Sequence, residues 1–139
     1  MAPASQFHLP PELAGQIISH ALAGYPEEVC GLVSGKDGVA MAVHRGRNIS
    51  ATPRATFELD HETLAKQIEI EEAGLELVAI YHSHPRGPAF PSETDLERAA
   101  YPDAFYLICD LADPARPTLH AFRYDDCRSR FAKLGIMLT

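Results

Sequence analysis

Residues 75–95, LELVAIYHSHPRGPAFPSETD, combine a strand pattern with a group of polar residues that follows it directly. The strand part, Leu75 to Tyr81, is apolar on both faces, which is typical of a strand at the centre of a sheet. His82 and His84 follow this strand two residues apart, so their side chains point to the same face. This stretch therefore predicts a central strand that carries two imidazoles at its end.

Asp95 lies eleven positions after His84, at the start of a helix expected over about residues 93–100 with Ser92 as its N-cap. The proline-rich loop between them is long and stiff enough to bring the helix back over the strand end. Two imidazoles and one carboxylate match a catalytic zinc site, which takes three protein ligands and keeps the fourth position for water. No cysteine lies nearby, which favours a catalytic zinc site over a closed structural one.

Ser92 and Asp95 also have the spacing of a capping box, although Asp stands where Glu or Gln is usual. We expect Asp95 to be a metal ligand instead, because the acid of a capping box is normally longer and because both roles are hard to fill at once. For Ser92, the N-cap role is compatible with a role in catalysis.

Hydrolysis at a metal site also needs a general base that takes a proton from water. Glu27 and Glu28 precede a short apolar run at residues 29–33, and by position alone either is a candidate. Both stand at the mouth of the expected strand, where an unpaired carboxylate costs less than inside it. Cys30, close by, is expected to be a small core residue and not a nucleophile.

Around the central strand, helical and strand patterns alternate, which predicts one mixed α/β domain over residues 1–139. The remaining expected elements are a helix from Pro10 and Pro11 to Gly24, strands over 29–33 and 39–48, a short strand over 56–59, a helix from Asp60 to Gly74, and strands over 104–111 and 119–124. In the helix after Asp60, Leu64 and Ile68 are expected to face inward. Residues 125–139 are expected to form a short helix and an extended tail.

The composition is that of an ordinary globular protein, with 139 residues, 46% hydrophobic and 22% charged. The net charge of −7 argues against nucleic acid as a partner. No apolar run is long enough to span a membrane. The N-terminal residues do not resemble a secretory signal, so we expect a cytoplasmic protein.

The sequence has three cysteines, Cys30, Cys109 and Cys127, without CxxC spacing. We expect buried thiols in a reducing compartment, with a bridge between one pair left open. The other histidines have no ligand spacing and are interpreted as surface or loop residues: His8, His20, His44, His61 and His120.

Three short segments together are similar to the signature of the JAMM (MPN+) metalloprotease family: Glu28-Val29-Cys30-Gly31, His82-Ser83-His84-Pro85, and Pro91-Ser92 with Asp95. The resemblance extends over about residues 12–124. It implies an α/β fold, a cytidine-deaminase-like MPN domain with a mixed central β-sheet flanked by helices. It also implies Zn²⁺ as cofactor, with His82, His84 and Asp95 as ligands. Glu28, in preference to Glu27, would be the general acid/base, and Ser92 would support the oxyanion.

The same resemblance implies a zinc-dependent peptidase or isopeptidase that acts after the C-terminal Gly-Gly of ubiquitin or a ubiquitin-like protein. The chain is short between Asp95 and the next strand, so it resembles a minimal, stand-alone prokaryotic member. Some such members act on ubiquitin-like sulfur carriers, so the C-terminal tail of such a carrier is the expected partner. This tail could lie extended beside an open strand edge near the zinc.

Two other functions compete with this one. A relative associated with DNA repair shares the metal motif but typically lacks the Glu-x-Cys-Gly element that begins at Glu28. A non-catalytic MPN scaffold would bind a protein partner without cleaving it, and such scaffolds have usually lost the ligand residues. Zinc deaminases and thermolysin-like proteases require motifs that this sequence lacks.

Overall fold

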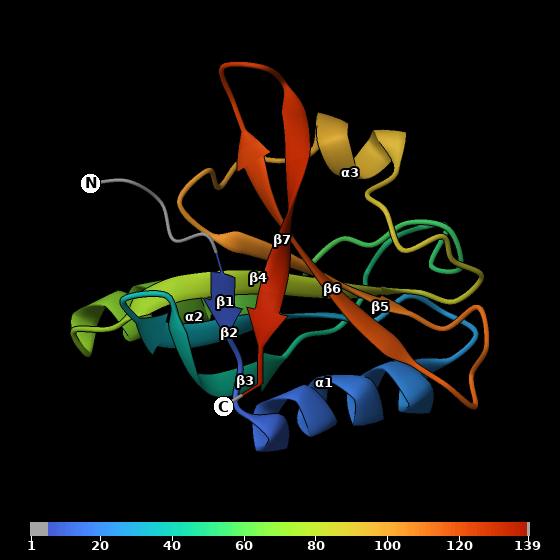
Figure 1. Ribbon diagram of the computed structural model, residues 1–139, viewed down its shortest axis with the longest axis horizontal. Helices are drawn as coiled ribbons and strands as arrows, with labels where there is room; N and C mark the ends of the chain where they lie inside the picture. The colour runs from blue at the N-terminus through green and yellow to red at the C-terminus, as the bar shows by residue number, and fades with distance from the viewer. Residues whose placement is uncertain (1–5, 139) are drawn as a thin grey trace.

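The computed structural model describes residues 6–138 of the chain. In this part, seven strands form a sheet that closes into a barrel in the order β1-β3-β2-β4-β5-β6-β7 (Figure 1). The strands are β1 (Gln6–His8), β2 (Cys30–Lys36), β3 (Val39–Arg45), β4 (Glu76–His84), β5 (Phe105–Asp110), β6 (Thr118–Asp125) and β7 (Arg130–Met137). The sheet is mixed, because β4 pairs antiparallel with β2 and parallel with β5.

Three helices accompany the sheet: α1 (Pro11–Gly24), α2 (His61–Glu72) and α3 (Glu93–Glu97). Helix α1 begins with a proline at its first position, which is favourable because the proline lacks only an N–H that would have no partner in the helix. It packs across β3, β4, β5 and β6 and lies along one side of the barrel, away from α3 (Figure 1). None of the three helices is long and apolar enough to cross a membrane.

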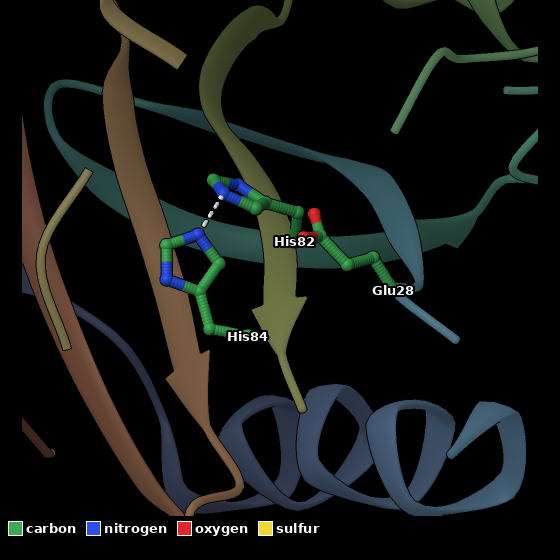
Figure 2. A group of neighbouring side chains, drawn as sticks. All are labelled: Glu28, His82 and His84. Atoms are coloured by element: carbon green, nitrogen blue, oxygen red, sulfur yellow. Dashed lines mark hydrogen bonds between the residues drawn. The ribbon is translucent and has the colours of Figure 1, made fainter. Parts of the chain in front are cut away.

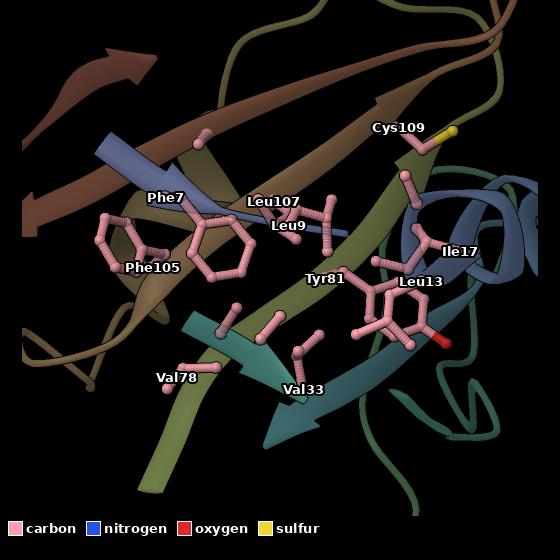
Figure 3. Close-up of a cluster of buried hydrophobic side chains, with 14 of the residues drawn as sticks. Phe7, Leu9, Leu13, Ile17, Val33, Val78, Tyr81, Phe105, Leu107 and Cys109 are labelled. Carbon is pink, nitrogen blue, oxygen red and sulfur yellow. The ribbon is translucent and has the colours of Figure 1, made fainter. Parts of the chain in front are cut away.

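Strand β4 separates two hydrophobic clusters, and every residue from Val78 to His84 is buried. Ala79 and Tyr81 belong to the larger cluster, where Tyr81 lies beside Leu13 and Ile17 of α1 (Figure 3). Ile80 belongs to the smaller cluster on the opposite face. Side chains alternate along a strand, so the two imidazoles that follow project to the same side as Ile80.

The expected short strand over residues 56–59 is absent, and only Leu59 forms an isolated bridge, with Asn48. The reason lies in the Asn48 side chain, which occupies the position of a neighbouring strand. Its Nδ2 donates to the carbonyl of Thr56 at 3.0 Å, and its Oδ1 accepts from the backbone N–H of Glu58 at 3.1 Å. These bonds satisfy backbone groups that would otherwise need hydrogen-bond partners on a neighbouring strand.

The prediction of a short C-terminal helix is wrong, because residues 130–137 form strand β7. Phe131 and Leu134 have helical spacing, whereas Leu134 and Ile136 have strand spacing, so the local pattern is ambiguous. Pairing with β6 on one side and with β1 on the other decides in favour of the strand. The third helix also ends earlier than expected, at Glu97.

Leu64 and Ile68 face solvent, contrary to the expectation that they point inward, and are 41% and 61% exposed. Helix α2 instead buries Thr63 and Ile70. Asp60 caps the helix and accepts from the Thr63 hydroxyl at 2.6 Å, which turns Thr63 toward the protein. This rotation takes the apolar positions 64 and 68 to the outer side.

The three cysteines are free thiols. Cys30 and Cys109 are buried as expected, but Cys127 is exposed, because it lies in the turn between β6 and β7. Of the five remaining histidines, expected to be surface or loop residues, only His61 is exposed; the other four are half-buried in a helix or a strand: His8, His20, His44 and His120. His20 on α1 is bonded to the Tyr81 hydroxyl at 2.7 Å, and His44 on β3 to the Ser34 hydroxyl at 2.8 Å; both are half-buried.

Candidate metal centre

The two imidazoles at the end of β4 face each other on one side of the sheet (Figure 2). The Nε2 atoms of His82 and His84 are 3.0 Å apart. Both side chains are buried, with 2% and 7% of the residue surface exposed. Because β4 is paired on both sides, the backbone beneath these histidines is held rigidly.

Asp95 completes the group from α3. Its Oδ2 atom is 3.1 Å from Nε2 of His82 and 3.1 Å from Nε2 of His84. In a tetrahedral zinc site with bonds of about 2.0–2.1 Å, neighbouring ligand atoms lie about 3.3 Å apart. The three atoms therefore need to move outward only slightly to surround an ion, and the donor set suits zinc.

Asp95 also closes a capping box at the start of α3. Its Oδ2 accepts from the backbone N–H of Ser92 at 2.8 Å, and the Ser92 hydroxyl accepts from the backbone N–H of Asp95 at 3.1 Å. The sequence analysis expected the capping box and a ligand role of Asp95 to be hard to combine; in the structure the capping box is formed while Asp95 also contacts both histidines. A carboxylate oxygen can accept several hydrogen bonds, so the same atom serves both.

Glu28 is buried immediately before β2, whereas its neighbour Glu27 is exposed. The Glu28 carboxylate and the two imidazoles offer atoms that all lie within 4.8 Å of one another (Figure 2). Its backbone is held by a bond from Glu28 N–H to the carbonyl of Pro53 at 2.7 Å and by a bond from Asn48 Nδ2 to the Glu28 carbonyl at 2.9 Å. Among the two candidate acids, only Glu28 is thus brought to the histidines.

Burial raises the pKa of Glu28 to about 7, with the Asp95 charge adding to this effect and His84 opposing it. Its Oε1 atom is buried and has no hydrogen-bond partner within residues 6–138. A buried carboxylate without a partner is unfavourable when charged. Glu28 is therefore suited to holding and releasing a proton near neutral pH.

Two sets of groups could hold an ion, and they share both histidines. The first uses Asp95, at 3.1 Å from each imidazole, and the second uses Glu28, within 4.8 Å of them. The Asp95 set is tighter. Asp95 is also more readily ionised than Glu28. Burial raises the pKa of Asp95, but the hydrogen bonds from the two histidines outweigh this effect and keep its pKa well below the usual range.

The pKa values of the two imidazoles shift in opposite directions. Burial lowers the pKa of His82 despite the nearby Asp95. Burial acts in the same direction on His84, but Asp95 and the carbonyl of Pro88 together raise its pKa. His84 donates from Nδ1 to the Pro88 carbonyl at 2.8 Å, which leaves Nε2 aimed at the other groups. Such a bond on the second nitrogen is usual for a metal-binding histidine.

Ser83, between the two histidines, was missed by the sequence analysis. Its side chain points to the opposite face of β4, where the hydroxyl accepts from the backbone N–H of Val29 at 2.9 Å. Its own N–H donates to the Val29 carbonyl at 3.0 Å. Both bonds tie the end of β4 to the residue that follows Glu28. The alternation of the strand predicts the direction of this hydroxyl, but no local signal identifies its partner.

Ser92 is exposed at the start of α3, and its hydroxyl is used in the capping box. The open strand edge expected beside the site is not found on the described strands that form it. Strands β2, β4 and β5 are each paired on both sides. The other histidines within residues 6–138 contribute to neither set of groups: His8, His20, His44, His61 and His120.

Comparison with known proteins identifies the family of the chain. Residues 10–125 match the family described as prokaryotic homologs of the JAB domain. The chain is 39% identical to a desampylase from Haloferax volcanii over 131 residues, 89% of this chain and 93% of the relative. It is 34% identical to a CysO-cysteine peptidase from Mycobacterium tuberculosis over 117 residues, 83% of this chain and 80% of the relative.

A solved structure supports the fold independently. A JAB1/MPN domain protein from Archaeoglobus fulgidus superimposes with a TM-score of 0.62 over 94% of this chain and 99% of that chain. Its sequence identity is 17%, so this similarity concerns the α/β fold alone.

Proposed function

The chain belongs to the family of prokaryotic homologs of the JAB domain and is a hydrolase of the JAMM type, and on this premise we propose its reaction. The protein uses zinc to hydrolyse the bond after the C-terminal Gly-Gly of a ubiquitin-like protein of the sulfur-carrier type. The partner enters the site with its C-terminal tail. We propose that this takes place in the cytoplasm, in a single domain with a cytidine-deaminase-like fold.

One observation carries the proposal: Nε2 of His82, Nε2 of His84 and Oδ2 of Asp95 lie within 3.0–3.1 Å of one another. We assign these three groups as the zinc ligands. Three protein ligands are typical of a catalytic zinc site, in which one position stays open. When bound, zinc supplies Lewis-acid activation of water and of the scissile carbonyl.

Glu28 moves the proton in the proposed reaction. Its carboxylate takes a proton from the attacking water and passes it to the amine that leaves. The pKa of about 7 suits both halves of this task, since the group can accept and return a proton near neutral pH. Glu27 has no such role, because it is exposed and lies outside the group.

Ser92 is proposed to stabilise the oxyanion. Its side chain is accessible at the start of α3, and its backbone N–H holds Asp95. The hydroxyl accepts from Asp95 N–H through its oxygen, so its proton remains available to a substrate oxygen. One such donor contributes about 3–4 kcal/mol to lowering the barrier.

We infer the substrate class from the names of the relatives. One relative is named a desampylase and another a CysO-cysteine peptidase. The second name describes a peptidase that acts on CysO-cysteine. We propose the same class of bond for this chain.

The test uses a linear fusion in which a Gly-Gly-terminated β-grasp protein is followed by a short peptide. We expect the protein to release the peptide after the second glycine, as read by mass spectrometry. A chelator abolishes cleavage, and added zinc restores it. The His82→Ala variant loses both one equivalent of zinc and the activity.

Three results would contradict the proposal. Cleavage that survives the chelator would exclude the zinc mechanism, and tight binding of zinc by His82→Ala would show that the ligand set is wrong. Binding of the tail without cleavage would favour the non-catalytic scaffold.

A further inference from the structure

The ring of Phe57 lies against the imidazole of His82. The two ring centroids are 4.4 Å apart, and the ring planes are inclined by only 25°, so the rings are stacked. Phe57 comes from the irregular segment between β3 and α2, far from His82 in the sequence. This contact therefore exists only in the folded chain.

The rings of the two histidines of the site are held by different contacts. His84 donates its second ring nitrogen to the carbonyl of Pro88. The corresponding nitrogen of His82, Nδ1, is buried and has no hydrogen-bond partner within residues 6–138. Metal-binding histidines usually rely on such a bond to fix the ring. For His82, the stacked ring of Phe57 lies flat against the imidazole and adds to the contacts that Nε2 makes with His84 and Asp95.

Phe57 is itself held in place from two directions. Its carbonyl accepts from Nη1 of Arg98 at 2.9 Å, and Arg98 is the C-cap of α3, the helix that carries Asp95. On either side of it, the carbonyl of Thr56 and the N–H of Glu58 are bonded to the Asn48 side chain. The segment that orients His82 is thus tied to the helix that positions Asp95.

We propose that Phe57 is a positioning residue for the metal centre. Its ring holds the His82 imidazole so that Nε2 points at His84 and Asp95, and Arg98 keeps Phe57 and α3 together. This inference rests on the proposed zinc ligands, but it concerns a residue outside the ligand set and the family motif. Removing the ring leaves the ligands present but less well oriented, so the affinity for zinc falls.

The test measures zinc affinity by competition with a chromogenic chelator, which does not depend on any substrate. Phe57→Leu keeps an apolar side chain but removes the flat ring, and we expect its zinc affinity to fall by about 10-fold or more. Phe57→Tyr retains the ring and should restore near wild-type affinity. The visible spectrum of the cobalt-substituted protein should change in Phe57→Leu and remain the same in Phe57→Tyr.

Phe131→Leu is the matched control. Phe131 packs against the same hydrophobic cluster as Phe57, but its ring makes edge-on or tilted contacts with Tyr106, Phe122 and Tyr124 and none with His82. Both leucine variants should lower the melting temperature of the metal-free protein by similar amounts. Only Phe57→Leu should weaken zinc binding.

Arg98→Met provides a second, gentler test, because it keeps the side-chain stem and loses only the exposed bond to the Phe57 carbonyl. We expect a loss of zinc affinity of about threefold. If Phe57→Leu does not fold, the outcome rests on this variant.

The inference is overturned if Phe57→Leu binds zinc as tightly as the wild type. Where only Arg98→Met folds, equal zinc affinity of that variant and the wild type overturns it. Either result leaves the proposed function intact. Failure of the wild-type protein to bind zinc overturns both.

Discussion

The ring of Tyr81 on β4 covers the α-carbon of Gly31 on β2, in the space that a side chain at position 31 would need. Gly31 and Tyr81 are direct partners in the β2–β4 ladder. A β-carbon at Gly31 would collide with the ring carbons and the hydroxyl oxygen of Tyr81. Tyr81 is fully buried, so its ring has no free space to move into. The glycine that follows Cys30 is therefore required by packing.

Gly31→Ala should lower the free energy of unfolding by about 1–3 kcal/mol, the usual cost of overpacking a close-packed core. Urea unfolding of the metal-free protein measures this loss. Gly15→Ala is the control, because nothing lies within 4 Å of a β-carbon at this position of α1. It should stabilise the protein by about 0.5–1 kcal/mol. An unchanged stability of Gly31→Ala would mean that Tyr81 moves aside freely.

Glu28→Gln should keep one equivalent of zinc and lose hydrolysis by about 10²–10⁴-fold, because the amide cannot accept the proton of water. Turnover of the Gly-Gly fusion and zinc content measure the two properties separately. The control is Glu27→Gln, which makes the same change in an exposed neighbour and should leave both unchanged. Loss of zinc from Glu28→Gln would instead identify Glu28 as a ligand, in the second of the two possible sets.

Asp95→Asn should separate the two roles of this side chain. The amide oxygen can still accept from Ser92 N–H, so the capping box and the stability of the metal-free protein are retained. The negative charge between the histidines is lost, and zinc affinity should fall by at least about 10-fold. Asp95→Ala should lose zinc affinity and, in addition, about 0.5–2 kcal/mol of stability, the range typical of helix caps. Wild-type zinc affinity in Asp95→Asn would exclude Asp95 from the ligands.

The His20–Tyr81 pair predicts a pH dependence of stability outside the metal centre. Burial and, to a lesser extent, the charge of Arg45 lower the pKa of His20 to about 4, compared with about 6.5 in the unfolded chain. Between these values the unfolded chain binds more protons, so stability decreases as the pH falls through this window. The neutral form of His20 stabilises the fold fully above pH 6.5, and this contribution is lost by about pH 4.

His20→Gln can still form a hydrogen bond with the Tyr81 hydroxyl but does not titrate. We expect the stabilities of wild type and His20→Gln to run parallel above pH 6.5, with the wild type declining more steeply below it. Chemical unfolding at intervals from pH 4 to 8 measures the difference. Parallel curves over the whole range would show that His20 titrates normally in the folded protein.

Five of the seven strands, β2 to β6, were predictable from local patterns, whereas β1 and β7, which close the barrel, were not. The apolar run before His82 identifies β4, and the proline pair at Pro10 and Pro11 correctly marks the start of α1. Where the local pattern was ambiguous, distant partners decided the outcome. β7 is a strand because β6 and β1 offer it hydrogen bonds, and residues 56–59 are irregular because Asn48 satisfies their backbone groups.

The sequence by itself determined which kinds of side chain meet at the candidate site. The period of two along a strand directs His82 and His84 to the same face, whatever the rest of the chain does. Only the tertiary structure decided that Glu28 is buried beside them while Glu27 faces solvent, and that Asp95 caps its helix and faces both imidazoles at once. The stacking of Phe57 on His82 also depends on it. These contacts join segments far apart in the chain, and their geometry follows from how β2, β4 and α3 pack together, which no local pattern encodes.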